Sequence, residues 1–317
     1  MCDAYSITLR PPVGQPRSVN HFRSIVVLIL LGLTWGLTIP LSKIAVSTGH
    51  RPMGLIFWQL VVLVVVLSLI AVVRRMRPLL NQRTLVYFLL IALLGAIIPN
   101  SVSYLTLAHL PAGVQGIVIA SVPIFSLGIA LGLRIEAPTR RRILGVLCGA
   151  AAVVLLVGPK TSLPEPGQAL FVLLALVAPF CYGAEGNYIA ARAPSGVDPV
   201  MTLLCASIIG CAIAWPLALL TGSWVDLSKP WDRAEWALLV SSLCHVAAYT
   251  GYVWLVGSAG AVFASQVAYV VTLAAVFSSA LILSETYSAW VWAALALMII
   301  GLAMVQPRAA PYPVAEP

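Results

Sequence analysis

Long apolar runs dominate the chain, and charged residues lie almost only between them. A helix rises 1.5 Å per residue, so a helix that crosses about 30 Å of hydrocarbon needs roughly 20 apolar residues. Runs such as 60–66 (LVVLVVV) lack the alternation of apolar and polar positions that a transmembrane β-strand requires. The pattern therefore predicts an all-α membrane protein.

The charges mark where the spans end. The windows between Arg83 and Arg134 and between Glu235 and Glu285 hold 50 and 49 uncharged residues, and each is long enough for two spans. Ten transmembrane helices are predicted, at 24–47, 54–73, 84–107, 112–134, 142–158, 168–191, 199–220, 235–256, 260–283 and 288–305. Residues 1–23 and 306–317 are predicted to be flexible cytoplasmic tails.

Composition supports a lipid-facing exterior. Only 9% of the residues are charged and 61% are hydrophobic, whereas an ordinary soluble domain has about 25% charged residues. With the N-terminus inside, 13 of the 18 Lys and Arg residues lie on the cytoplasmic side and 5 on the other. This bias predicts a multi-pass protein with both termini in the cytoplasm. The basic residues form no stretch interleaved with aromatics, which argues against a nucleic-acid partner.

The six cysteines indicate neither a metal site nor a disulfide framework. None forms a CxxC pair and five lie within apolar runs, which is typical of buried small hydrophobic residues. No cofactor is expected.

An internal repeat relates the two halves of the chain. Offsets of 147 to 149 residues align Trp35-Gly36 with Tyr182-Gly183, Pro52 with Pro199, and Glu136 with Glu285. We expect a first repeat at 24–158, a linker at 159–167 and a second repeat at 168–305. Because five spans are an odd number, the halves would be inverted in the membrane. Inverted repeats are typical of secondary transporters, whose binding site lies near the midplane between the repeats.

In this register the chain resembles the EamA family of the drug/metabolite transporter superfamily. The resemblance is carried by Trp35-Gly36, Lys43, Ala120-Ser121-Val122-Pro123, Glu136, Gly145, Ser284-Glu285 and Gly301. It implies ten helices in two inverted halves, alternating access, and export of small metabolites such as amino acids from a bacterial cytoplasm across the inner membrane. Family members often have an arginine in the second helix, where this chain has 57–60 (FWQL), so no role of that arginine carries over.

Polar side chains within the spans are candidates for the transport site, because such groups are costly in hydrocarbon and usually face the bundle interior. Helices of both halves line a central cavity in the family. The resulting substrate-binding candidates are Trp35, Thr38, Asn100, Tyr104, Gln115, Tyr182, Tyr249, Gln266 and Tyr269. For the aromatic residues, packing and a place in the interface belt are the alternatives.

Two ionisable residues lie well inside spans, Glu185 and His245. Glu185 is either a carboxyl that couples transport to protons or binds a substrate ammonium, or a structural group paired with Arg192 through Tyr188 or water. His245 is either a proton carrier or a hydrogen-bonded core histidine. Lys43 lies in the opposite leaflet from Glu185, which argues against a salt bridge between them, and is expected to extend to the outer interface.

Glu136 and Glu285 are predicted to be structural. Each precedes a predicted helix, whose positive N-terminal end attracts a carboxylate.

Two other classes of function compete with the transporter interpretation. An intramembrane enzyme acting on a lipid-like or small polar substrate would need convergent catalytic groups, but the sequence contains no HExxH and no GxSxG motif. A channel would show rings of charge or a repeated filter loop. The expected partners are therefore a small-molecule substrate and the lipid bilayer. A homodimer is compatible with the sequence but not required by it.

Overall fold

The computed structural model describes residues 21–133, 139–159, 162–165, 167–194, 196–259 and 261–305. Within these ranges the chain is helical and contains no strand, which confirms the all-α prediction. The two predicted tails, apart from 21–23, lie outside the described residues, as does Glu136.

The helices of the first half are α1 (His21–Val46), α2 (Pro52–Val73), α3 (Gln82–Ala92), the π-helix η1 (Leu93–Ile97), α4 (Ile98–Leu107), α5 (Ala112–Ile119), α6 (Val122–Gly132) and α7 (Arg140–Val157). The helices of the second half are α8 (Gln168–Ala175), α9 (Val177–Arg192), α10 (Pro199–Leu220), α11 (Arg233–Ala259), α12 (Ala261–Ala264), α13 (Val267–Leu283) and α14 (Ala289–Val305).

Four of the predicted spans are broken into shorter helices. The predicted helix 84–107 consists of α3, η1 and α4, and the predicted helix 112–134 consists of α5 and α6. Likewise 168–191 consists of α8 and α9, and 260–283 of α12 and α13. Three of the breaks lie beside a proline, at Pro99, Pro123 and Pro179, which sit in the first turns of α4, α6 and α9. A proline has no N–H to donate to the preceding turn, so a continuous helix tends to break beside it.

The protein crosses the membrane several times. In the described part of the chain, seven helical segments are long and apolar enough to span a bilayer, namely Phe22–Val46, Pro52–Val73, Gln82–Leu107, Ala112–Gly132, Gln168–Arg192, Pro199–Leu220 and Arg233–Val256. The helices α13 and α14 are apolar but shorter. The count of ten spans therefore stays a prediction.

The exterior of the bundle is apolar, as contact with lipid tails requires. Leu220 and Leu281 are each 83% exposed, and Val72 and Val73 are each 74% exposed. In water such side chains would form an aggregating surface; in a bilayer they face hydrocarbon.

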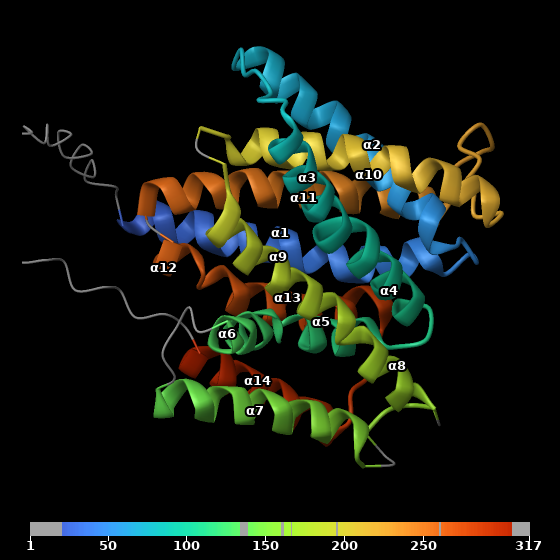
Figure 1. The fold of residues 1–317 in the computed structure, drawn as a ribbon. Helices are drawn as coiled ribbons and strands as arrows, with labels where there is room; N and C mark the ends of the chain where they lie inside the picture. The colour runs from blue at the N-terminus through green and yellow to red at the C-terminus, as the bar shows by residue number, and fades with distance from the viewer. Residues whose placement is uncertain are drawn as a thin grey trace, which may run out of the picture.

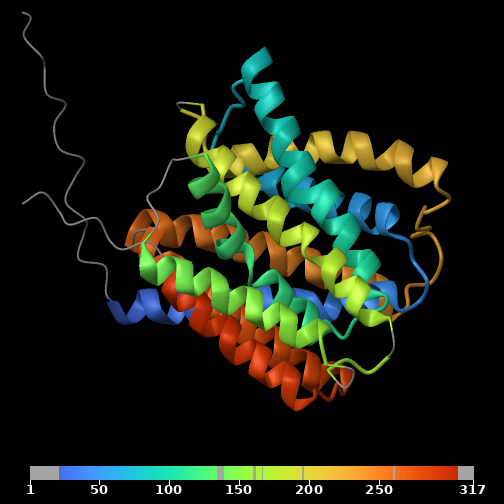
Figure 2. The same ribbon diagram turned by 60° about the horizontal axis from the view of Figure 1, so that its bottom comes forward.

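The main helix pairs between the two halves stay the same when the first half is exchanged for the second. Helix α2 packs on α10 and α7 packs on α14, and these two pairs lie on opposite sides of the bundle (Figures 1 and 2). Helix α1 packs on α11 and α13, while its counterpart α9 packs on α4 and α6. These main contacts of one half thus have equivalents made by the other half, as expected of a two-repeat architecture.

The aligned glycines make equivalent contacts. A β-carbon built on Gly36 of α1 would lie 2.5 Å from the β-carbon of Ala274 in α13, and one built on Gly183 of α9 would lie 2.8 Å from the backbone nitrogen of Ser126 in α6. Gly145 and Gly301 face each other between α7 and α14 in the same way. Small residues let membrane helices approach closely, and here they do so at matching positions.

Candidate functional site

A small cavity lies between the two halves of the protein. The first half contributes α2, α3, η1 and α4 to its wall, and the second half contributes α9, α10 and α11. Its polar lining consists of Gln59, Asn100, Glu185, Ser207 and His245. The cavity encloses about 40 Å³, which is room for about three water molecules and far below the ~300 Å³ of a typical small-molecule pocket. In this conformation the site is therefore closed around its polar groups.

Glu185 is the carboxylate of this cavity. Its side chain, partly buried on α9, makes no hydrogen bond or ion pair with any residue in the described part of the chain. In the described residues no hydrogen bond joins Tyr188 to Glu185 or to Arg192; Arg192 is exposed, and the Tyr188 ring stacks on Tyr87 with 5.7 Å between ring centroids. The alternative link to Arg192 through water stays a prediction. A buried carboxylate without a cationic partner is costly in a low-dielectric interior. The group is therefore suited to taking up a proton or a cation.

The carboxyl of Glu185 rests against η1. A β-carbon built on Gly95 would lie 2.6 Å from the side-chain Cδ of Glu185 and 2.8 Å from its Oε2. Only a glycine fits at this position without displacing the carboxyl. Gly95 thus makes the space that Glu185 occupies.

Two hydrogen bonds between tyrosines and amides organise the neighbouring wall. The Tyr182 hydroxyl of α9 donates to Asn100 Oδ1 of α4 at 3.0 Å, which joins the two halves beside the cavity. The buried Tyr104 hydroxyl donates to Gln59 Oε1 of α2 at 2.9 Å. Asn100 lines the cavity directly, whereas Tyr104 and Tyr182 contact it through the amides they hold.

His245 lies on the other side of the cavity and is covered by an aromatic residue. The Trp35 ring packs edge-on against the His245 ring, with 5.9 Å between centroids, and also against Tyr252 at 5.9 Å. Trp35 itself is not part of the cavity lining. Trp35 therefore packs against the histidine without lining the cavity itself.

The other predicted site residues do not line this cavity. Thr38 donates its hydroxyl to the Trp35 backbone carbonyl at 2.6 Å. Gln115 accepts from the Thr106 hydroxyl at 3.1 Å, while its buried Nε2 has no partner in the described residues. Tyr249, Gln266 and Tyr269 are partly buried at other positions in α11 and around the start of α13. A role for these five residues in substrate binding stays a prediction.

Sequence reasoning missed Gln59, Gly95 and Ser207. Gln59 is the single amide in the long apolar run of the second span, and this signal was available. The importance of Gly95 and Ser207 depends on which helices face them, and the sequence alone does not give that information.

One end of the bundle, which the charge bias predicts to be the outer end, is closed by polar contacts. At this end the Lys43 Nζ donates to the carbonyls of Leu107 at 2.6 Å and Leu110 at 3.0 Å. It thereby satisfies carbonyls at the C-terminal end of α4, which a cation stabilises. The prediction that Lys43 extends toward the outer interface is untested, but its amine has protein acceptors at this end of the bundle.

Glu285 binds a helix N-terminus, but not that of the helix following it. Its carboxylate accepts from the backbone N–H of Ala112 at 2.7 Å and of Gly113 at 3.1 Å, both at the start of α5 in the other half. The Tyr287 hydroxyl adds a third bond at 2.7 Å. The predicted structural role is confirmed, and the capped helix is α5, which brings the two halves together.

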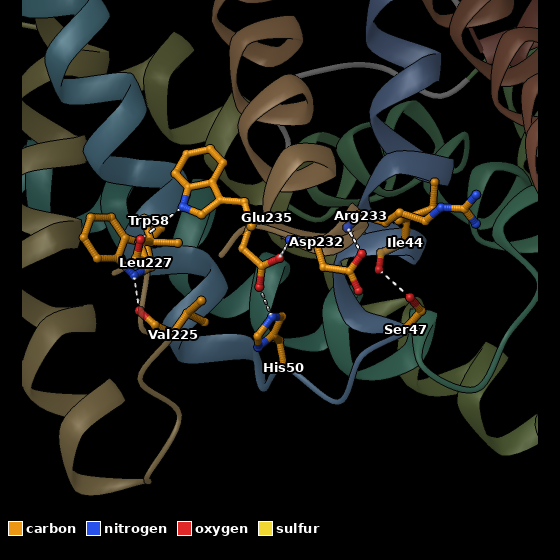
Figure 3. A network of polar contacts seen from close by, with 10 residues as sticks. Ile44, Ser47, His50, Trp58, Val225, Leu227, Asp232, Arg233 and Glu235 are labelled. Atoms are coloured by element: carbon orange, nitrogen blue, oxygen red, sulfur yellow. Dashed lines mark hydrogen bonds and ion pairs between the residues drawn. The ribbon is translucent and has the colours of Figure 1, made fainter. Parts of the chain in front are cut away.

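Loops of the two halves meet at the same end (Figure 3). His50, after α1, lies with Nε2 at 2.8 Å from Glu235 Oε1, and the other carboxylate oxygen accepts from the Asp232 N–H at 2.9 Å. The Trp58 indole donates to the carbonyl of Val225 at 2.9 Å. These contacts join the α1–α2 loop to the first turn of α11, and helix α2 to the segment before α11.

Comparison with known proteins identifies the family. The model of the EamA-like transporter family matches this chain twice, at residues 22–158 and 169–306. The chain belongs to the EamA-like transporter family. Each half of the chain thus holds one copy of the family's repeat. Membership indicates that the protein is a transporter of the drug/metabolite type.

Solved structures share the fold of this family member. Matches were found to 15 chains of solved structures. One of them, described as "Crystal structure of protein", is 17% identical, and the alignment covers 89% of this chain and 96% of the other with a TM-score of 0.58. This likeness concerns the fold alone. Among curated proteins no match was found.

Proposed function

We propose that this protein is a secondary transporter that exports small metabolites, such as amino acids, by alternating access. The supporting observation is the inter-repeat cavity, which lies where helices of both halves meet and whose lining includes Glu185, His245, Asn100 and Gln59. Sites at the interface of inverted repeats are typical of such transporters. The two repeats, at 24–158 and 168–305, form ten spans in inverted orientation.

The charge bias predicts the orientation of the protein, and the family resemblance implies a bacterial inner membrane. The protein lies in the bacterial inner membrane with both termini in the cytoplasm. The end of the bundle held by Lys43 and Glu285 then faces outward. Bonds from Glu285 to the start of α5 join the two halves at that end, so opening to the outside requires them to break.

Transport is coupled to protons through Glu185. Its carboxyl faces the cavity and has no cationic partner in the described residues. Desolvation favours the neutral, protonated form of a carboxyl, and water entering the cavity favours release of the proton. An exchange of a proton against substrate at one carboxyl would link an inward proton gradient to export.

The test is flux in proteoliposomes, with and without an imposed pH gradient, against a panel of amino acids, purines and amines. Saturable, gradient-driven flux of one class is expected. Glu185→Gln should abolish the gradient-dependent part, because an amide cannot carry the proton. Gly186→Ala is the matched control, since Gly186 is next along α9 and a β-carbon there meets nothing within 4 Å.

Two outcomes would contradict the proposal. Flux that stays gradient-driven in Glu185→Gln, at wild-type abundance, would exclude Glu185 as the coupling group. Chemical turnover of a solute without any flux would favour an intramembrane enzyme instead.

A further inference from the structure

The helix turn that faces Glu185 is not α-helical. Within η1, the N–H of Ile98 donates to the carbonyl of Leu93, five residues back, instead of four. Short π-segments of this kind are rare and occur frequently at functional sites. Here the segment includes Gly95, the residue against which the Glu185 carboxyl rests.

Pro99 follows this segment and removes a hydrogen-bond donor. A proline has no N–H, so it leaves the preceding turn with at least one carbonyl, of Leu94 or Gly95, that lacks its helical partner. A backbone acceptor without a donor costs several kcal/mol in a membrane interior. Such a carbonyl is retained only where another group donates to it.

We propose that Glu185 and this carbonyl of η1 form one composite proton-binding site. The protonated carboxyl of Glu185 donates its O–H to the unpaired carbonyl, which satisfies the backbone acceptor. On deprotonation the O–H bond breaks, the proton passes to water in the cavity, and the carboxylate and carbonyl, both acceptors, repel each other. This inference rests on the proposed proton coupling and assigns Gly95 and Pro99 as positioning residues for it.

Other titratable groups surround the site without replacing Glu185. Helix α9 itself adds Cys181 and Tyr182, α3 adds Tyr87, and α11 adds Tyr249 and, across the cavity, His245. The cavity-lining side chains of α2, α4 and α10 are not titratable, and α6, which packs on α9, has no titratable side chain. Among these groups only Glu185 and His245 ordinarily titrate at or below neutral pH.

Infrared difference spectroscopy of the purified protein in lipid, titrated over pH, tests the inference without needing a known substrate. Wild type should show a protonated carboxyl band at the frequency of a hydrogen-bonded acid, and Glu185→Gln should remove it. Pro99→Ala restores the backbone donor and should lower the midpoint pH of the band by about one unit, because the protonated form loses an acceptor. Gly95→Ala should shift it in the same direction by displacing the carboxyl. Gly186→Ala should leave the midpoint unchanged.

The outcomes separate this inference from the proposed function. A Glu185 band whose frequency and midpoint are the same in wild type, Pro99→Ala and Gly95→Ala would overturn the composite site, although proton-coupled flux could persist. If neither variant folds, the wild-type band decides, and a frequency typical of a carboxyl without a hydrogen bond would refute the inference. Conversely, gradient-independent flux would overturn the coupling while the band could still show the composite site.

Discussion

Replacing Glu285 with alanine should release the first turn of α5. Its carboxylate accepts two backbone N–H bonds, at 2.7 Å from Ala112 and 3.1 Å from Gly113, and one from the Tyr287 hydroxyl at 2.7 Å. Hydrogen bonds to a charged group contribute roughly 1.5–3 kcal/mol each, and the helix dipole adds about 0.3–1 kcal/mol. Taking the low end for a partly exposed carboxylate, the two amide bonds give about 3 kcal/mol.

Hydrogen exchange measured by mass spectrometry in lipid nanodiscs reports on this turn. A loss of about 3 kcal/mol corresponds to roughly a hundredfold faster exchange of the Ala112 and Gly113 amides. Glu285→Gln keeps an amide oxygen but not the charge, so its effect should be smaller, on the order of tenfold. The neighbouring exposed Thr286, replaced by alanine, serves as the control and should leave exchange unchanged.

Unchanged protection of the two amides in Glu285→Ala would refute the reasoning. It would mean that the start of α5 is held by packing and not by the carboxylate. Equal effects of the alanine and glutamine variants would contradict the electrostatic part of the argument alone, since the charge would then contribute nothing.

Three further predictions concern other contacts. Gly301→Val should lower the thermal unfolding temperature in detergent, because a β-carbon built on Gly301 would lie 2.8 Å from the Gly145 carbonyl oxygen and overpacking costs about 1–3 kcal/mol. An unchanged unfolding temperature would contradict the close packing of α7 on α14. Tyr104→Phe should cost about 1–3 kcal/mol by leaving the buried Gln59 oxygen unpaired, and Tyr104→Phe combined with Gln59→Leu should recover much of the loss. Burial raises the pKa of Tyr287, in the loop before α14, so the contribution of Tyr287 to stability is complete below about pH 10 and is lost as pH rises further. Tyr287→Phe should therefore reduce the loss of stability at alkaline pH, and a pH profile identical to that of wild type would contradict this prediction.

The helical class and the doubling of the chain could be predicted because they depend on one-dimensional patterns. Charge-free windows fix where the chain can remain in hydrocarbon, and the aligned Trp35-Gly36 and Tyr182-Gly183 pairs mark the repeat. The breaks within the spans were harder to predict from the sequence. The sequence shows Pro99 and Pro123 inside apolar runs, where a proline tends to break a helix. It does not show that the turn before Pro99 is a π-helix facing a carboxylate.

The candidate site could be predicted only in part. Glu185, His245 and Asn100 were found because polar groups in long apolar runs are rare and costly. Gln115 and Tyr269 have the same sequence signal, yet they lie away from the cavity, since periodicity gives the face of a helix and not the partner of that face.

The sequence alone determined that this chain lies in a membrane, that it is helical and that it consists of two related halves, because hydropathy, charge and repetition act locally along the chain. The tertiary structure decided which polar groups meet. It placed Glu285 on the start of α5 rather than on its own following helix, Lys43 on the end of α4, and Gly95 beneath the Glu185 carboxyl. These contacts join residues about 60 to 170 positions apart and depend on how helices pack, which no local pattern specifies.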